Sequence, residues 1–158
     1  MALTDRQKMD KTDLKIIRVL QERPEITLRD LAHAAGLSHS PCWRRIQNLQ
    51  KAGILSERRF LVDAQAAGYE ILVFCLIRMA HHKREYLSAF EDAVAAVPEI
   101  LQCYSLSGEH DYILQVIARN VKDYETTVKN ALVQLPHVQT ISTSFTLKRV
   151  KETANVPV

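Results

Sequence analysis

This chain of 158 residues carries 21 Lys and Arg against 18 Asp and Glu, a formal net charge of +3. The charge is unevenly distributed: residues 1–62 hold 12 basic and 7 acidic side chains, net +5, whereas residues 63–158 hold 9 and 11, net −2. The basic first part indicates an anionic partner such as DNA, and the second part a neutral or self-associating role. No apolar run approaches the ~18 residues that cross a bilayer, and no signal peptide is recognisable. We therefore expect a cytoplasmic protein.

The three cysteines, Cys42, Cys75 and Cys103, are far apart and match neither a disulfide framework nor a metal-ligand spacing. We interpret each one as a small core residue. The pair His81-His82 also lacks a third ligand at a suitable spacing, and adjacent side chains of an extended segment point to opposite faces. We therefore expect no metal site. No nucleophile with a base and an orienting group is recognisable either, so the sequence does not predict an enzyme.

Residues 10–22 and 27–53 predict a small core of three helices. Apolar side chains recur there every three or four residues, which is typical of helices with one buried face. These positions are Leu14, Ile17, Leu20, Leu28, Leu31, Ala32, Ala35, Cys42, Ile46 and Leu49. Thr27, with Asp30 three residues later, is a variant of the capping box and predicts the start of the second helix. Gly36 favours the left-handed conformation that ends a helix, so the arrangement predicts a helix-turn-helix.

The third helix is the candidate recognition helix. We expect Ser40 as its N-cap, Pro41 at its first position, and an end near Ala52, before Gly53. Its outer face is polar and basic, as suits a helix in the major groove of DNA. After Gly53, alternating apolar and polar residues predict a wing strand. The candidate DNA-binding residues are Ser38, His39, Ser40, Trp43, Arg44, Arg45, Gln47, Lys51, Arg58 and Arg59.

These candidates differ in their expected roles. Arg44 and Arg45 lie about 100° apart on a helix, so one reads a base edge or a phosphate while the other flanks it. Trp43 either packs beside the first helix or faces a thymine methyl, and we favour packing. Gln47 is a candidate adenine reader. The serines and His39 at the helix entrance suit either phosphate contact or capping, and Lys51, Arg58 and Arg59 suit phosphate contacts.

After a linker at residues 63–70, residues 71–158 predict a second domain with the order βαββαβ. The expected strands are 71–80, 100–107, 112–118 and 138–150, and the expected helices are 83–97 and 123–135. This order is typical of the ferredoxin-like α+β fold, an antiparallel sheet with two helices on one face. The other face is apolar and needs a cover, so we predict face-to-face dimerisation. A two-fold dimer suits a palindromic operator.

The loop between the second and third strands is the candidate ligand site. Its residues are Ser107, Gly108, Glu109, His110, Asp111 and Tyr112. Gly108 permits close backbone approach, and Asp111 can pair with an α-amino group. A plain hairpin loop is the alternative.

The segments DKTDLKIIRVLQ, LAHAAGLSHSPCWRRIQNLQKAGIL, PEILQCYSLSGEHDYIL and LPHVQTISTSFTLKRVK resemble the leucine-responsive and asparagine-responsive regulators, the Lrp/AsnC or feast/famine family. The resemblance covers nearly the whole chain. It implies a winged helix-turn-helix joined to a ferredoxin-like effector domain, the latter often called RAM, that regulates amino-acid metabolism. It also implies dimers that often assemble to octamers, with a small amino acid bound between ferredoxin-like domains of neighbouring dimers. By the same resemblance, Thr143, Ser144 and Phe145 line that pocket.

Short strings within the family, such as SPCWRRI, AHH and SGEHDY, are most similar to the branch that senses cysteine, while leucine or methionine are the other candidate effectors. The family's loop usually reads Gly-Asp-x-Asp, whereas this chain has Gly108-Glu109-His110-Asp111. That departure leaves the effector's identity open. Two other functions also stay open: a nucleoid-type DNA-organising protein, which the charge of +5 fits poorly, and an amino-acid-binding regulatory module of a metabolic enzyme, which the basic helix-turn-helix disfavours.

Overall fold

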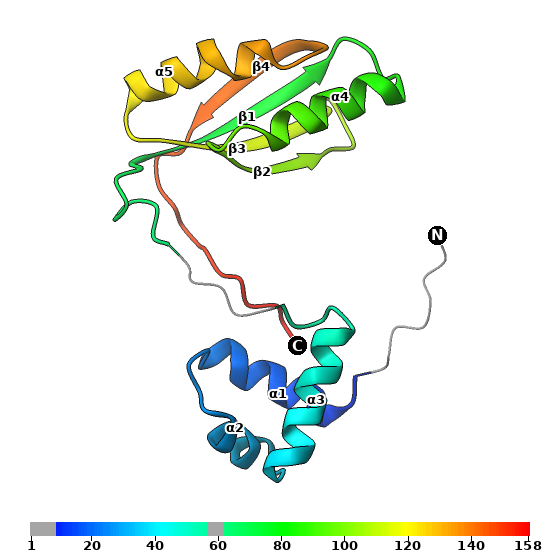
Figure 1. Cartoon of the computed structure of the whole chain (residues 1–158). Coiled ribbons are helices and arrows are strands. Elements are labelled where there is room, and N and C mark those ends of the chain that lie inside the picture. The colour runs from blue at the N-terminus through cyan, green and yellow to red at the C-terminus, as the bar shows by residue number, and fades with distance from the viewer. Residues whose placement is uncertain (1–8, 57–61) are drawn as a thin grey trace. The chain divides into compact units, whose positions relative to one another are not determined.

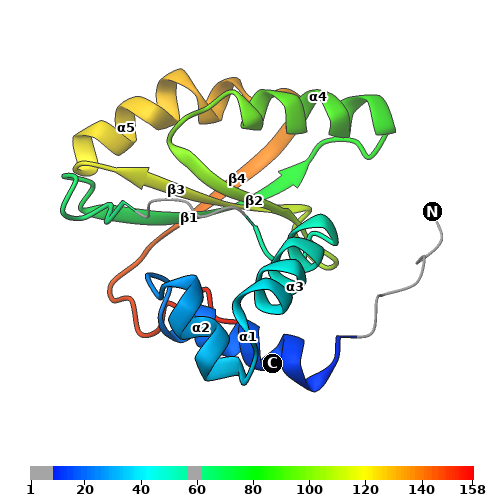
Figure 2. The same ribbon diagram turned by 60° about the horizontal axis from the view of Figure 1, so that its bottom comes forward.

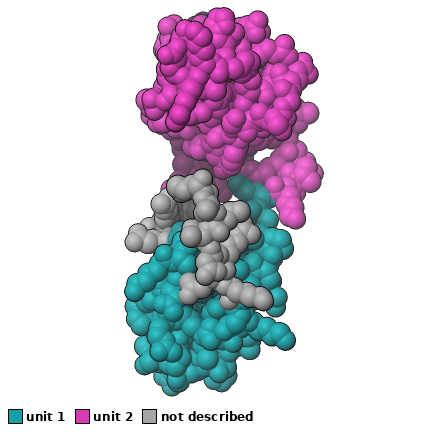
Figure 3. Space-filling view, turned by 90° about the vertical axis from the view of Figure 1, so that its right-hand side faces the viewer, with its two compact units in different colours: residues 1–60, 152–158 teal, residues 61–151 magenta. Residues whose placement is uncertain are grey.

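The computed structural model describes residues 9–56 and 62–158, and the chain divides into two compact units (Figure 3). The first unit comprises Met1–Phe60 with Glu152–Val158, and the second comprises Leu61–Lys151. Residues 152–158, expected in the ferredoxin-like domain, group with the first unit by their contacts. The reason is local: the side chain of Gln21 in the first unit hydrogen-bonds the backbone of Val156. Within the described residues, no helix is long and apolar enough to cross a membrane.

The first unit contains three helices, α1 (Lys11–Glu22), α2 (Leu28–Ala35) and α3 (His39–Lys51) (Figure 1). The N-cap of α1 is Asp10, and Thr27 caps α2 by accepting a hydrogen bond from the backbone of Asp30. Gly36 ends α2 with φ +72°, the left-handed conformation expected of it. Apolar side chains from all three helices, including Ile16, Leu31 and Cys42, form one buried cluster.

The predicted start of the third helix was wrong by two residues. Helix α3 begins at His39 after the N-cap Ser38, whose carbonyl accepts a hydrogen bond from the backbone N–H of Cys42. Pro41 therefore lies at the third helical position rather than the first. The missing N–H of Pro41 costs no helical hydrogen bond at this position, because the backbone N–H groups in the first turn of a helix have no carbonyl acceptor within the helix. Most of the predicted wing strand, with Arg58 and Arg59, lies outside the described residues.

The second unit is a four-stranded antiparallel sheet with two helices on one face, as the sequence predicts (Figures 1 and 2). Its strands are β1 (Ile71–Met79), β2 (Ile100–Ser105), β3 (Tyr112–Ala118) and β4 (Val138–Phe145), in the spatial order β2-β3-β1-β4. The helices are α4 (Arg84–Ala95) and α5 (Val121–Asn130), the latter followed by the short 3-10 helix η1 (Leu132–Gln134).

Several predicted boundaries in this unit differ from the structure by a few residues, and two of these differences have an identifiable cause. Strand β4 ends at Phe145 instead of Val150, because its partner β1 begins at Ile71 and pairs only as far as Val73 with Phe145. Helix α5 begins two residues before the predicted Asp123, since the side chain of Asn120 caps it by accepting from the Asp123 backbone N–H. Both boundaries depend on residues outside the element itself: β4 on the strand it pairs with, and α5 on the capping residue Asn120.

The two faces of the sheet differ in burial. On the helix-covered face, alternate residues of β1 and β3 are fully buried and pack against Phe90 of α4 and Tyr124 of α5. On the opposite face, neighbouring strands present Leu72, Phe74, Leu76, Ile113, Ile117 and Tyr104. Phe74 is 36% exposed and Tyr104 56% exposed. The second unit therefore has one sheet face, rich in apolar side chains with polar ones such as Gln115 and Ser144 among them, that the unit itself leaves uncovered.

Candidate DNA-binding face and effector loop

One side of α3 carries a line of polar residues that points away from the core. Ser40, Arg44, Gln47 and Lys51 follow one another at intervals of four, three and four residues, which places them on one face of a helix. The buried Cys42 and Leu49 lie on the opposite face. Ser40, Arg44 and Lys51 are exposed, whereas Gln47 is half-buried and donates a hydrogen bond to Gln50 over 3.0 Å. We refer to this polar line as the candidate recognition face of α3.

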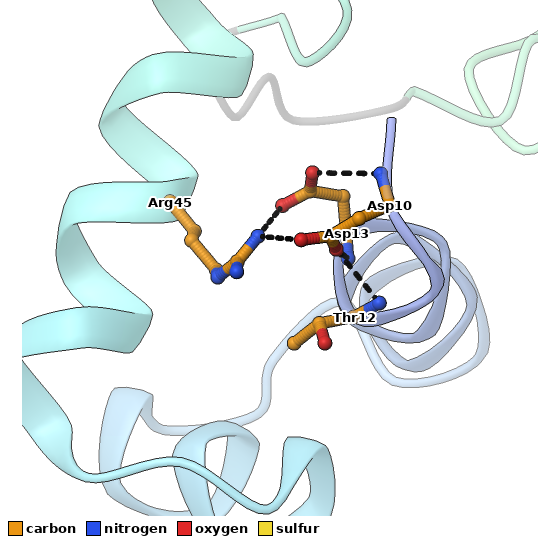
Figure 4. Close-up of polar contacts among 4 residues, drawn as sticks. All are labelled: Asp10, Thr12, Asp13 and Arg45. Atoms are coloured by element: carbon orange, nitrogen blue, oxygen red, sulfur yellow. Dashed lines mark hydrogen bonds and ion pairs between the residues drawn. The ribbon is translucent and has the colours of Figure 1, made fainter. Parts of the chain in front are cut away.

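Arg45 does not belong to the recognition face, because it points toward α1. One nitrogen of its guanidinium lies 2.8 Å from a carboxylate oxygen of Asp10 and 2.7 Å from one of Asp13 (Figure 4). The two carboxylates also cap α1, where Asp10 accepts from the backbone N–H groups of Thr12 and Asp13. The pKa of Asp10 lies below its ordinary value, mainly through the hydrogen bond from the Asp13 backbone and further through Arg45. Of the adjacent pair, Arg44 is therefore the arginine that faces outward.

The remaining DNA-binding candidates lie around this face. Trp43 is 51% exposed, so the expectation that it packs beside the first helix holds only for part of its ring. Trp43 lines a hollow of about 550 Å³ together with Leu20 of α1 and Pro24 just after that helix. Ser38, His39 and Ser40 are exposed at the start of α3, although the hydroxyl of Ser38 makes no capping hydrogen bond. The helix entrance thus leaves these polar groups available to an external partner.

The loop after β2 is attached to the end of β1 through Asp111. One carboxylate oxygen of Asp111 accepts a hydrogen bond from the Met79 backbone N–H over 2.7 Å, and the other lies 2.8 Å from Nε2 of His82. The hydrogen bond from Met79 is the main reason why the pKa of Asp111 lies below its ordinary value, and His82 lowers it further. Asp111 is therefore ionised and already held by this chain.

A second ion pair joins the tip of the loop to β1. Arg78 lies 3.0 Å from the Glu109 carboxylate, and both side chains are substantially exposed. Gly108 has φ +145°, a backbone conformation that favours glycine, and a Cβ built there would meet no atom within 4 Å. Ser107 and Glu109 are exposed and His110 is half-buried. The loop and the end of β1 thus bring two carboxylates, one arginine and two histidines to one end of the sheet.

The structure does not bring the other predicted effector residues to this loop within one chain. Tyr112 is 4% exposed and turns toward the helices, where its hydroxyl donates a 2.7 Å hydrogen bond to Glu91. Thr143, Ser144 and Phe145 are paired with Cys75, Phe74 and Val73 of β1, whereas the backbone N–H of Asp111 donates to the Ile77 carbonyl. Along β1 these positions lie two to four residues from Ile77, roughly 7–13 Å. The hydroxyl of Thr143 instead contacts that of Tyr124 at 2.9 Å, and Phe145 packs edge-on against the same ring.

Sequence reasoning missed four side chains that shape these sites. Asp10 and Asp13 were assigned to a helix start without their role in holding Arg45, and Arg78 and His82 were not linked to the loop. The contact of Asp10 and Asp13 with Arg45 could have been predicted, because acidic residues at the start of one helix and an arginine on the side of another are opposite charges. Arg78 and Glu109 are 31 positions apart in the sequence, and His82 and Asp111 are 29 apart, so only the pairing of the strands reveals these contacts.

No group of three or more potential metal ligands lies together in the part of the chain that the structure describes. Cys42 and Cys75 are buried and Cys103 is half-buried, and burial raises the pKa of each thiol. Raised thiol pKa values mean little thiolate at neutral pH, which agrees with the expectation that these are packing residues.

Two family models match the chain, one for each unit. A winged helix-turn-helix DNA-binding model matches residues 9–56, and the Lrp/AsnC ligand binding domain matches residues 72–156. Together they contain both the recognition face and the loop at Asp111.

Individual relatives match over almost their whole length. The leucine-responsive regulatory protein of Rhizobium meliloti is 34% identical over 153 residues, which are 97% of this chain and 98% of that protein. The DNA-binding transcriptional activator DecR of Escherichia coli K12 is 31% identical over 95% of this chain and 99% of that protein. A transcriptional regulator from Neisseria meningitidis, solved as a complex with L-Met, is 33% identical with a TM-score of 0.88 and covers 94% of this chain and 96% of that chain.

Proposed function

Since this chain belongs to the Lrp/AsnC family of DNA-binding transcriptional regulators with an amino-acid-responsive ligand domain, we propose that it binds a palindromic operator and that a small amino acid modulates this binding or its assembly. The family consists of transcriptional regulators and not of enzymes, which sets aside the regulatory module of a metabolic enzyme. A nucleoid-type protein is disfavoured by the modest charge of the first part.

The observation that carries the DNA-binding proposal is the recognition face of α3. Arg44 stands exposed at its centre and makes none of the contacts that hold Arg45 to α1. An exposed arginine at this position of a helix-turn-helix can reach a guanine edge or a phosphate. Lys51 at the end of the helix suits a phosphate, and Gln47 can reach a base only by leaving Gln50. Arg44 is therefore the principal DNA contact in this proposal.

The matched variants Arg44→Ala and Arg45→Ala test this assignment. We expect Arg44→Ala to lower operator affinity by about 1–3 kcal/mol if it reads a base, with the free energy of unfolding unchanged. Arg45→Ala should lower the stability of the first unit, with a smaller direct effect on DNA contacts. Fluorescence anisotropy titrations with an operator fragment at several salt concentrations separate the two. Equal operator affinity in wild type and Arg44→Ala would remove Arg44 from the interface.

We further propose that two copies pair through the uncovered sheet face of the second unit. The apolar side chains on that face, among them Phe74 and Tyr104, lose contact with water when a second sheet covers them. Face-to-face pairing relates the two helix-turn-helix units by a two-fold axis, which suits the palindromic operator. Assembly of dimers to an octamer follows from the family resemblance. Light scattering of wild type and Phe74→Asp checks both steps, and an unchanged mass in Phe74→Asp would contradict the proposed face.

The effector site in this proposal is the loop from Ser107 to Asp111. Its carboxylates suit the ammonium group of an amino acid, and Arg78 is a cation at the same end of the sheet. Because Thr143, Ser144 and Phe145 are paired with the middle and first half of β1, away from the loop, we propose that they complete the pocket from a second copy. The Neisseria relative was solved with L-Met and the Rhizobium relative is named leucine-responsive, which supports methionine and leucine, beside cysteine, as candidate effectors.

A thermal-shift screen of the twenty amino acids identifies the effector, because a ligand at 100 times its Kd adds about 2.7 kcal/mol to stability. Asp111→Asn then tests the site. Asparagine keeps an oxygen for the Met79 N–H and removes the charge, so the loop stays attached while the ammonium partner is lost. We expect this variant to bind the operator and to lose the response to the effector. A wild-type dose response in Asp111→Asn would contradict the assignment.

A further inference from the structure

The outer face of α1 carries a second binding surface, which has no part in the proposed operator or effector sites. Gln21 makes two hydrogen bonds with a single backbone residue: its Nε2 donates to the Val156 carbonyl over 3.0 Å, and its Oε1 accepts from the Val156 N–H over 2.6 Å. Arg18, one turn earlier on the same face, donates from Nε to the Val158 carbonyl. These contacts involve only the main chain of the bound segment.

The spacing of the two partners is compatible with an extended peptide. Alternate residues of an extended chain present their carbonyls on the same side, about 6.6 Å apart, whereas residues three apart on a helix rise about 4.5 Å. The long side chains of Arg18 and Gln21 cover that difference. Pro157, between the two bound residues, favours an extended conformation at Val156 and has no N–H that would need a partner. The segment is thus suited to lie along α1 as a single strand.

An apolar contact accompanies the hydrogen bonds. The side chain of Val158 packs against the buried cluster of the first unit, the same cluster that contains Ile16 and Ile17 of α1. Val156, by contrast, is 62% exposed and is held through its backbone alone. Residues 152–158 therefore group with the first unit, although the chain reaches them from β4 of the second (Figures 1 and 3).

We propose that residues 152–158 form a detachable strap whose docking on Arg18 and Gln21 restrains the helix-turn-helix unit. The covalent connection between the units runs through residues 57–70, and the docked strap closes a second path from β4 to α1. Two connections allow the first unit fewer orientations than one does, since a closed loop has less conformational freedom. The contacts that close this path include three hydrogen bonds from or to side chains of α1 and one half-buried valine, and the helical hydrogen bonds of α1 stay in place when the strap is released.

The matched variants Gln21→Leu and Glu22→Leu test the strap in the full chain. Leucine at position 21 removes both hydrogen bonds to Val156 and keeps a similar size, whereas Glu22 is an exposed neighbour that serves as the control. We expect amide exchange at Val156, measured by NMR, to accelerate about tenfold in Gln21→Leu and to change less than about twofold in Glu22→Leu. Urea unfolding followed by Trp43 fluorescence verifies that both variants remain folded.

The same samples measure the restraint. Nitrogen relaxation of amides in α1–α3 should give a shorter rotational correlation time in Gln21→Leu than in Glu22→Leu, because the released unit tumbles more freely. The proposal is overturned if Val156 already exchanges rapidly in the wild type, or if both variants exchange alike. It also fails if the correlation time stays constant while exchange rises. A Val156 exchange rate that increases on dilution would place the segment of a second copy on α1 and would equally overturn it.

Discussion

Replacement of Arg45 by alanine should weaken the packing of α1 against α3 and not the recognition face itself. The Arg45 guanidinium lies 2.7 Å from Asp13 and 2.8 Å from Asp10, and no other described ion pair links these two helices. After the substitution the two carboxylates at the start of α1 repel each other without a cation between them. We therefore expect Arg45→Ala to destabilise the first unit, while Arg44→Ala on the outer face leaves its stability unchanged within about 0.5 kcal/mol.

The exposure of the two side chains sets the expected size of the effect. Side-chain exposure is 32% for Arg45 and 17% for Asp13, so the pair is better shielded from water than a typical surface ion pair. Exposed pairs contribute about 0.2–1 kcal/mol, and hydrogen bonds to charged groups about 1.5–3 kcal/mol. Because Arg45 keeps a third of its surface in water, we expect a coupling energy with Asp13 of about 1 kcal/mol. Asp10 is half exposed and adds less.

A double-mutant cycle measures this coupling directly. The wild type, Arg45→Ala, Asp13→Ala and the double variant are unfolded in urea, and Trp43, the only tryptophan of the chain, reports on the first unit from its place in α3. The cycle removes the separate contribution of Asp13, which also accepts a hydrogen bond from the Asp10 backbone N–H. Repetition in high salt should reduce the coupling, since salt screens partly exposed charges. A coupling energy below about 0.3 kcal/mol would refute the reasoning, because the stability effects of two sites that do not interact also deviate from additivity by about that amount.

Three further outcomes are expected. Gly36→Ala should destabilise the first unit by about 1–2 kcal/mol, measured by urea unfolding, because a side chain is strained at φ +72° although its Cβ meets nothing within 4 Å; no loss would contradict that conformation. Phe90→Ala should cost about 3–5 kcal/mol of the second unit's stability by calorimetry, because the ring is fully buried against Tyr112; a loss under about 1 kcal/mol would exclude full burial. Asp111 has a pKa below its ordinary value of 3.8, so its ionised form stabilises the fold above about pH 4 and this contribution disappears as the pH falls further. The stability difference between wild type and Asp111→Asn should therefore shrink in acid, and a constant difference would contradict the ionised contact.

Periodicity predicted most of the elements because each carries its own signal. The one-sided apolar spacing of α1 and α2, the cap at Thr27 and the left-handed Gly36 are local properties, and the structure confirms them. The βαββαβ order and the ferredoxin-like plan followed from the alternation of strand and helix patterns. The family resemblance then joined the two parts. The start of α3 was wrong because a proline is tolerated anywhere in the first helical turn, so Pro41 did not mark a unique position.

The candidate sites were less predictable, because they depend on which strands and helices meet. The polar face of α3 could be predicted from the sequence. The different roles of Arg44 and Arg45 could not, because they depend on the packing of α1, which places Asp10 and Asp13 against Arg45. The loop residues Gly108 and Asp111 were identified, but their attachment to Met79, His82 and Arg78 depends on the pairing of β1 with β3. The register of β1 with β4 places Thr143 to Phe145 opposite residues 75 to 73, in the middle and first half of β1.

The sequence by itself determined the two-part organisation, the helix-turn-helix, the strand order along the chain and the basic character of the first part. These features are encoded in local spacing, capping residues and charge, which act over a few neighbouring positions. Only the tertiary structure decided which arginine faces outward, which groups already hold Asp111, and where residues 152–158 dock. Those outcomes join residues about 30 to 140 positions apart, and the contacts exist only after the helices and strands have packed.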